Sequence, residues 1–248
     1  MDQCVRLLRP HLAGPEACVV GGGKTRRKIC AAHFSPFPSV SPSMIPWFSM
    51  KLFRLAPDPA DARSRASLGF GMVYGCLSFG VVSTLAYSIW AFRLVPGTVG
   101  LYTTTALVYL GLGGLALSRL VAAPGAAWRF TLCFATVFLA YAVCWCAFWF
   151  GLKGEMRADF LGAATGLAVM TWLFMRAFGP PRGFLAMFAV LLALHSVGYY
   201  AGEYLYALVR GANGRLLWGA AHGLGFGAGL GYVLFQCQRR RPAPAESA

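Results

Sequence analysis

The sequence predicts an all-α membrane protein, a bundle of about six transmembrane helices with both termini in the cytoplasm. Composition gives the first observation, because hydrophobic residues make up 58 % of the 248 residues and charged residues only 12 %. A soluble domain carries about 25 % charged residues. The second observation is that the charges lie in short clusters between long apolar runs. A run of about 20 mainly apolar residues is long enough to cross the hydrocarbon core of a bilayer as a helix.

Six apolar runs are the candidate spans. They are continuously apolar, without the alternation of lipid-facing and lumen-facing residues that a transmembrane β-barrel needs. A helix also bonds every backbone amide within its own segment, as hydrocarbon requires. The first run begins far along the chain and has others behind it, so it is not a signal peptide. The predicted spans, of which the fourth is the shortest, are Leu68–Phe92, Val99–Leu117, Phe130–Phe150, Phe160–Met175, Phe184–Val209 and Leu216–Phe235.

Lysine and arginine are distributed unequally between the two sides of the predicted bundle. Cytoplasmic loops carry the excess of these residues, so the richer side, which holds both termini, is predicted to be cytoplasmic in an inner or plasma membrane. The net charge of +14 is then a topology signal with some attraction to the anionic lipid of the bilayer. No motif or basic surface indicates nucleic-acid binding. The richer side holds Lys51, Arg54, Arg63, Arg65, Arg119, Arg129, Arg176, Arg182 and Arg239–Arg241, and the other side Arg93, Lys153, Arg157, Arg210 and Arg215.

Composition also divides the chain into four segments. Residues 1–49 are rich in glycine, proline and serine and lack periodicity, which predicts disorder, or an extension ahead of a natural start at Met44 or Met50. Residues 50–67 form a basic juxtamembrane segment, residues 68–236 the six-helix bundle, and residues 237–248 a basic, disordered tail. The loops after residue 50 are too short to fold into a domain, so we expect any functional site to lie within the bundle or at its edge.

The fifth predicted span carries the side chains that are least expected in a bilayer. His195, Tyr199 and Glu203 are spaced four residues apart and therefore lie on one face of the helix. Glu203 is the only acidic residue inside the six runs. The only histidines inside them are His195 and, in the sixth run, His222. Ionisable groups in a membrane usually face the protein interior and mark a pathway, a ligand or a buried pair. These four residues are the candidate binding site.

The depth of these side chains can be counted from the ends of the two runs. Glu203 lies seven residues before Arg210, and His222 lies seven residues after Arg215. The two runs are antiparallel, so this spacing predicts that Glu203 and His222 lie at the same depth and form a hydrogen-bonded or ionic pair. His195 is then expected at a depth about a turn or two away from that of His222.

The sixth run has a face made of glycine. Gly219, Gly223, Gly227 and Gly231 repeat every four residues, which gives three GxxxG steps in succession. Small residues at this spacing let a neighbouring helix approach closely. The neighbour is predicted to be another helix of the chain, or a second copy or other membrane protein bound through this face.

The same run contains Ala221-His222-Gly223 followed by Gly227 and Gly231. It resembles the last helix of rhomboid intramembrane proteases, in which a catalytic histidine opens a glycine-rich helix, and six spans with both termini inside also suit that family. Rhomboids pair this histidine with the serine of a GxSG motif in the fourth span. This chain has Ala163-Ala164-Thr165-Gly166 there, and the second-span histidine and asparagine of the family are missing. Thr165 is a candidate nucleophile only if His222 reaches it.

Three hypotheses on function follow. The first is binding or movement of a small solute or proton at the polar site, and it is favoured because an acid at the centre of a span costs about 2.5–3.5 kcal/mol to insert. The second is a non-catalytic scaffold or lipid-binding bundle, in which the polar side chains only join helices. The third is an intramembrane enzyme with rhomboid-like features. A metal or haem is also conceivable, because two histidines can act as ligands, and the sequence leaves the cofactor open.

Overall fold

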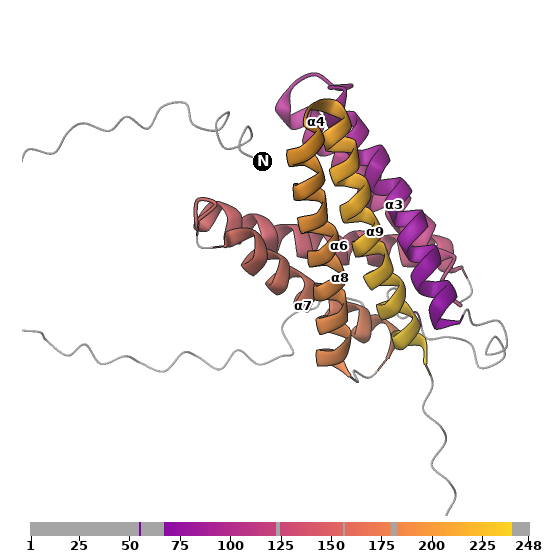
Figure 1. The fold of residues 1–248 in the computed structure, drawn as a ribbon. Helices are drawn as coiled ribbons and strands as arrows, with labels where there is room; N and C mark the ends of the chain where they lie inside the picture. The colour runs from indigo at the N-terminus through magenta and orange to yellow at the C-terminus, as the bar shows by residue number, and fades with distance from the viewer. Residues whose placement is uncertain (1–54, 56–66, 123–124, 156, 180–182, 240–248) are drawn as a thin grey trace, which may run out of the picture. The chain divides into compact units, whose positions relative to one another are not determined.

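The computed structural model describes residue 55 and residues 67–122, 125–155, 157–179 and 183–239, which all belong to one compact unit, Pro46–Ala248. The described residues are helical, with no strand among them (Figure 1). The predictions for residues 1–49, for a start at Met44 or Met50, and for residues 240–248 lie outside the described residues. Of the predicted juxtamembrane segment, only Leu55 and Ser67 are described.

Six helices are present in the described residues, close to the six predicted runs. The second is one continuous helix, Thr98–Ser118, made of two α-helical parts with a π-helical stretch between them. α7 is longer than predicted, because it continues through Asp159 in its first turn and Arg176 in its last. The bounds are α3 Leu68–Ala91, α4 Thr98–Val108, η3 Tyr109–Gly113, α5 Gly114–Ser118, α6 Ala126–Gly151, α7 Ala158–Phe178, α8 Phe184–Val209 and α9 Gly211–Gln238.

Five of these helices are long and apolar enough to cross a membrane: α3, the helix Thr98–Ser118, α6, α7 and α8. α9 is not among them although it has 28 residues, because eight of those residues are glycine and contribute little apolar surface. The chain therefore has the composition of a membrane protein, with a sixth helix adapted to close packing.

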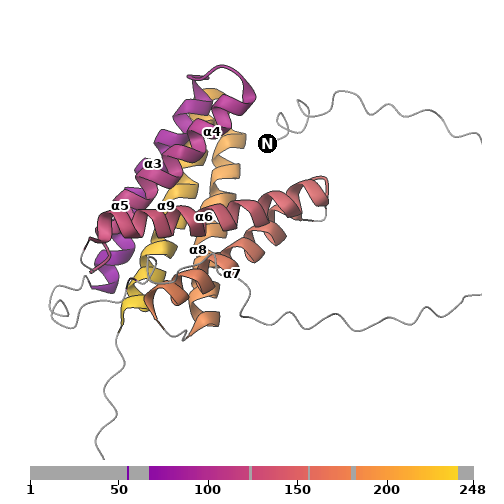
Figure 2. The ribbon, with the colours of Figure 1, turned by 180° about the vertical axis from the view of Figure 1, so that it is seen from behind.

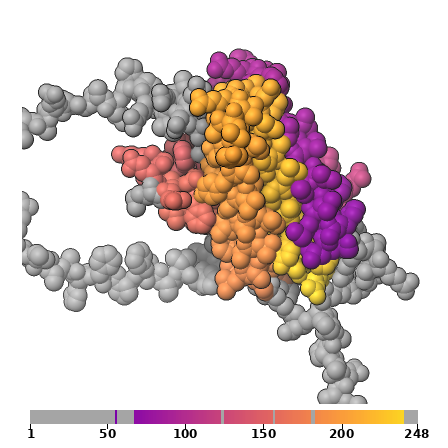
Figure 3. Space-filling view, in the orientation of Figure 1, coloured from indigo at the N-terminus to yellow at the C-terminus, as the bar shows by residue number. Residues whose placement is uncertain are grey.

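α3, α8 and α9 run side by side, with α9 in the middle (Figure 1). The space-filling view shows the three in contact along this face (Figure 3). α6 crosses behind them at a steep angle and pairs with α7, which is clearest from the other side (Figure 2). The side chains that α6 sends toward α8 and α9 therefore come from a limited stretch around the crossing point.

Glycine brings α3 and α9 into backbone contact. A Cβ atom added at Gly227 would collide with the carbonyl oxygen of Gly75, and one added at Gly231 would collide with the carbonyl oxygen of Gly71. Gly219 and Gly223 also lie against α3. The predicted glycine face of α9 is thus covered by a helix of the same chain.

A second set of glycines brings α8 against the other side of α9. A Cβ atom added at Gly198 would lie 2.7 Å from the carbonyl oxygen of Ala221, and one added at Gly202 would lie 3.0 Å from that of Trp218. Gly225 of α9 meets the backbone of α8 in the same way. This close approach allows side chains on the two helices to touch directly.

A single residue, Arg210, connects α8 to α9. Its backbone has φ 53° and ψ −176°, a conformation used almost only by glycine. We expect Arg210→Gly to raise the free energy of unfolding by about 1 kcal/mol, which is about 2–4 °C in melting temperature for a chain of this size. Arg210→Ala is the matched control, because it removes the same charge but keeps the strained Cβ. Thermal denaturation in detergent measures both, and an equal effect of the two variants would contradict the strain.

Candidate functional site

His195 of α8 and His222 of α9 meet inside the helix bundle. Their Nε2 atoms are 3.2 Å apart and the rings are nearly perpendicular, at 88°. Both side chains are buried, with 2 % of His195 and 9 % of His222 exposed. Their backbones lie about one turn apart in depth, within the predicted range, and the side chains meet because glycine contacts bring α8 and α9 close together.

Tyr141 joins the histidines from α6. Its hydroxyl is 3.0 Å from Nε2 of His195, and 8 % of the side chain is exposed. Tyr141, His195 and His222 are called the histidine cluster below. It links three helices, and it lies where α6 crosses the α8–α9 pair.

The hydrogen bonds of the histidine cluster leave part of it unsatisfied. A neutral imidazole has one N–H donor and one acceptor nitrogen. Only one proton fits between the two Nε2 atoms, so one ring carries its proton on Nε2 and the other on Nδ1. Both Nδ1 atoms are buried without a hydrogen-bond partner among the described residues. Leaving such an atom unpaired costs about 1–3 kcal/mol, and in native proteins it often marks a water or an ion.

Aromatic rings surround the cluster. The ring of Phe226 is 5.0 Å from that of His195, and the ring of Trp218 is 5.0 Å from that of His222. Tyr199 lies beside both histidines, with its ring centre 6.2 Å from His195 and 6.3 Å from His222. The predicted residue Tyr199 therefore forms part of the wall. Rings on several sides lower the local dielectric constant, which strengthens any electrostatic interaction made there.

Glu203 has a different partner from the predicted one. Its Oε1 accepts a hydrogen bond of 2.9 Å from Nε1 of Trp218, one turn before His222 on α9. The predicted depth of His222 was measured from Arg215 as the start of its helix, but α9 begins at Gly211. The turn is therefore centred on Arg210, and Glu203 reaches the level of Trp218. The prediction of a Glu203–His222 pair is wrong, because the actual partner of Glu203 lies about one helical turn earlier on α9.

The Glu203–Trp218 bond is testable by a double-mutant cycle with Trp218→Phe and Glu203→Leu. We expect a coupling energy between about 0.6 and about 1.7 kcal/mol, the range from mean to maximum for such contacts in a membrane. Trp218→Phe leaves the carboxylate without its donor, so it should destabilise the wild type more than the Glu203→Leu background. Reversible unfolding in mixed detergent gives the four free energies. Strictly additive values would mean that the bond contributes nothing.

A second polar contact lies between α3, η3 and α9. The hydroxyl of Ser83 is 2.7 Å from that of Tyr109 and 2.6 Å from the carbonyl oxygen of Gly219. A carbonyl only accepts, so Ser83 donates to Gly219 and accepts from Tyr109. The hydroxyl of Ser83 thus has both a donor and an acceptor within the protein, so these hydrogen bonds form a structural contact between helices. Tyr109 belongs to the π-helical stretch of the second helix and meets α3 through this contact.

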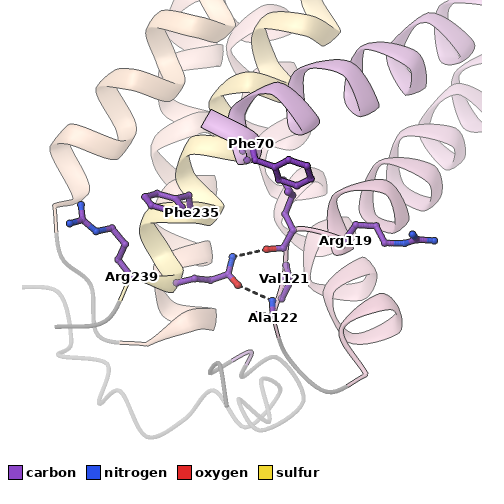
Figure 4. A pocket seen from close by; sticks show the side chains of 10 residues that line it. Phe70, Arg119, Val121, Ala122, Phe235 and Arg239 are labelled. Carbon is purple, nitrogen blue, oxygen red and sulfur yellow. Dashed lines mark hydrogen bonds between the residues drawn. The ribbon is translucent and has the colours of Figure 1, made fainter. Parts of the chain in front are cut away.

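A described pocket lies elsewhere. It has a volume of about 420 Å³ and lies at the ends of α3, α5 and α9, as Figure 4 shows. Gln238 fills its polar side, donating to the carbonyls of Leu120 and Leu234 and accepting from the amide of Ala122. Arg119 and Arg239 point away from each other at its two sides (Figure 4). Its buried polar groups are paired, so the histidine cluster is the better candidate site.

Four residues of these contacts were not singled out from the sequence: Ser83, Tyr109, Tyr141 and Trp218. Each is a side chain with a polar tip inside an apolar run, which is the signal that could have found them. The partner of each is on another helix, and sequence spacing does not give it. The glycines Gly198 and Gly202, one and two turns after His195, were the available signal for the close α8–α9 contact.

The described hydrogen bonds do not support a rhomboid-like pair of His222 and Thr165. The hydrogen-bond partner of His222 is His195, and none of the hydrogen bonds of the described residues joins it to Thr165. The described cysteines are all free thiols, and no group of three or more histidine, cysteine or acidic residues gathers in the described part of the chain. Comparison of the chain with protein-family models, with curated proteins and with solved structures finds no match in any of the three.

Proposed function

We propose that this chain is a multi-pass protein of the inner or plasma membrane that binds a small solute or proton at the histidine cluster. The proposal includes six spans with both termini in the cytoplasm. α9 is counted as a span because it packs against α3 and α8. The observation that carries it is the buried contact of His195 with His222, in which both Nδ1 atoms have no described partner. A purely structural contact would be expected to satisfy its buried polar atoms.

Binding has better support than movement. A proton path from the cluster toward Glu203 would need groups that both donate and accept. The described bond to Glu203 comes from the indole of Trp218, which only donates. Transport along the predicted His195–Tyr199–Glu203–His222 stripe would therefore have to pass through Tyr199 and not through Trp218, whereas binding needs only the contacts of the cluster itself.

The scaffold hypothesis remains the alternative. A second copy or another membrane protein bound through Gly219, Gly223, Gly227 and Gly231 would compete with α3 for that face. A partner would more easily use the lipid-facing sides of the helices. The histidine cluster would then only hold the helices together by polar contacts, each of which contributes about 0.6 kcal/mol to stability.

Native mass spectrometry of the detergent-purified full-length protein tests the proposal, beside pH-dye measurements in proteoliposomes. The wild type is compared with His222→Gln, and with His33→Gln as a control at a histidine distant in sequence from the site. We expect a bound mass or a proton response in the wild type and the control, reduced about tenfold or more in His222→Gln. Equal results for all three proteins would contradict a site at His222.

A further inference from the structure

The space between the two histidines limits what the site can hold. The Nε2 atoms are 3.2 Å apart, which is hydrogen-bond distance, so no organic solute fits between them. A single ion needs no separate cavity, because it would be held directly between the ligand atoms. Of the occupants compatible with the proposed function, this leaves a proton or a metal ion between the rings.

The separation of the donor atoms suits a metal ion. Imidazole nitrogens bind Zn²⁺ at about 2.0–2.1 Å. Two nitrogens at this distance are about 2.9 Å apart at a right angle and about 3.4 Å apart at the tetrahedral angle. The observed 3.2 Å lies between these values. The hydroxyl of Tyr141, 3.0 Å from the Nε2 atom of His195, is at the spacing of a third ligand.

The chemistry of the donors selects the class of ion. Imidazole suits zinc, copper, nickel and iron, whereas calcium and magnesium prefer sets of oxygen ligands. The described cysteines lie outside the hydrogen-bonded cluster, so no thiolate is offered there. Each ring would donate its Nε2 lone pair to the ion and keep its proton on Nδ1, and the partner of that N–H would be a water, as for other buried groups without a protein partner.

We propose that the histidine cluster binds one late first-row transition-metal ion through Nε2 of His195 and Nε2 of His222, with the Tyr141 hydroxyl as third ligand. The inference rests on the proposed function and names the occupant of that same site. Metal binding requires unprotonated ligand nitrogens, so affinity should fall as the solution becomes acidic.

The test loads full-length protein in detergent with Zn²⁺ alone, removes free metal and counts zinc by plasma mass spectrometry. We expect one ion per chain from the cluster, lost about tenfold or more in His195→Gln and in His222→Gln. Tyr141→Phe keeps the ring and should weaken affinity by about tenfold. The double variant His11→Gln/His33→Gln, which changes the other two histidines, should keep the ion. Unchanged zinc in both cluster variants would overturn the inference.

X-ray absorption of the zinc-loaded wild type needs no variant and covers the case in which a cluster variant does not fold. Two imidazole nitrogens at about 2.0–2.1 Å are expected, whereas a shell of sulfur at about 2.3 Å would place the ion on cysteines and overturn the inference. A non-metal mass lost in His222→Gln, without zinc binding, would overturn the metal alone and leave the proposed function. No occupant of any kind at the cluster would overturn both.

Discussion

Leucine in place of Gly75 is expected to lower the free energy of unfolding by about 3 kcal/mol or more. Overpacking a tight contact typically costs about 1–3 kcal/mol, and more where the neighbour cannot move. At Gly75 the neighbours are backbone atoms of α9, including the amide nitrogen and the Cα atom of Gly231, both 3.2 Å from an added Cβ. Backbone cannot rotate away as a side chain can. Thermal denaturation in detergent, followed by the loss of monodisperse protein, measures the change.

Gly69→Leu is the matched control for this prediction. Gly69 is also in α3, but nothing lies within 4 Å of a Cβ atom added there. The two variants therefore share helix, residue type and added volume, and differ only in the α9 contact. Similar melting temperatures would contradict the close packing of α3 against α9.

Replacing the whole histidine cluster by apolar side chains is expected to abolish binding and keep the fold. In the triple variant His195→Leu/His222→Leu/Tyr141→Phe, no polar atom of the cluster is left without a partner. Exchanging a buried polar group for apolar side chains of similar size is often neutral or stabilising. We expect a melting temperature equal to or above that of the wild type, and binding at least about tenfold weaker.

The same triple variant distinguishes a binding site from a cluster that only joins helices by polar contacts. If the cluster only joins helices, its loss should destabilise the protein by about 0.6 kcal/mol for each contact removed. A clear fall in melting temperature with unchanged binding would then favour the scaffold hypothesis. Binding is read by native mass spectrometry and zinc content, and stability by thermal denaturation.

The helices were predictable because hydrocarbon length and continuous apolarity determine them locally. α8 has the predicted bounds, α3 ends one residue before its predicted end, and the other helices extend past the predicted ends. The extensions contain glycine or charged residues, such as Gly211 and Asp159, which an apolar criterion stops at. The faces that pack were also visible in the spacing of glycine on α9.

Contacts between helices were harder to predict, because they depend on register and crossing angle. The one-residue link at Arg210 shifts the α8–α9 register by about a turn from the predicted one. The partner of Glu203 is therefore Trp218 and not His222. Tyr141 enters the site because α6 crosses α8 and α9 steeply, and nothing in its own periodicity indicates this (Figure 2). The type of residue at the site was predictable, and its pairing was not.

Nitrogen NMR of the two helix histidines tests the central claim most directly. In the His11→Gln/His33→Gln background only His195 and His222 remain, so labelling histidine with ¹⁵N marks these two rings alone. The contact at 3.2 Å predicts a ¹⁵N–¹⁵N correlation between the two Nε2 atoms in the membrane-reconstituted protein. Two independent imidazole signals with no correlation would contradict a site built from His195 and His222.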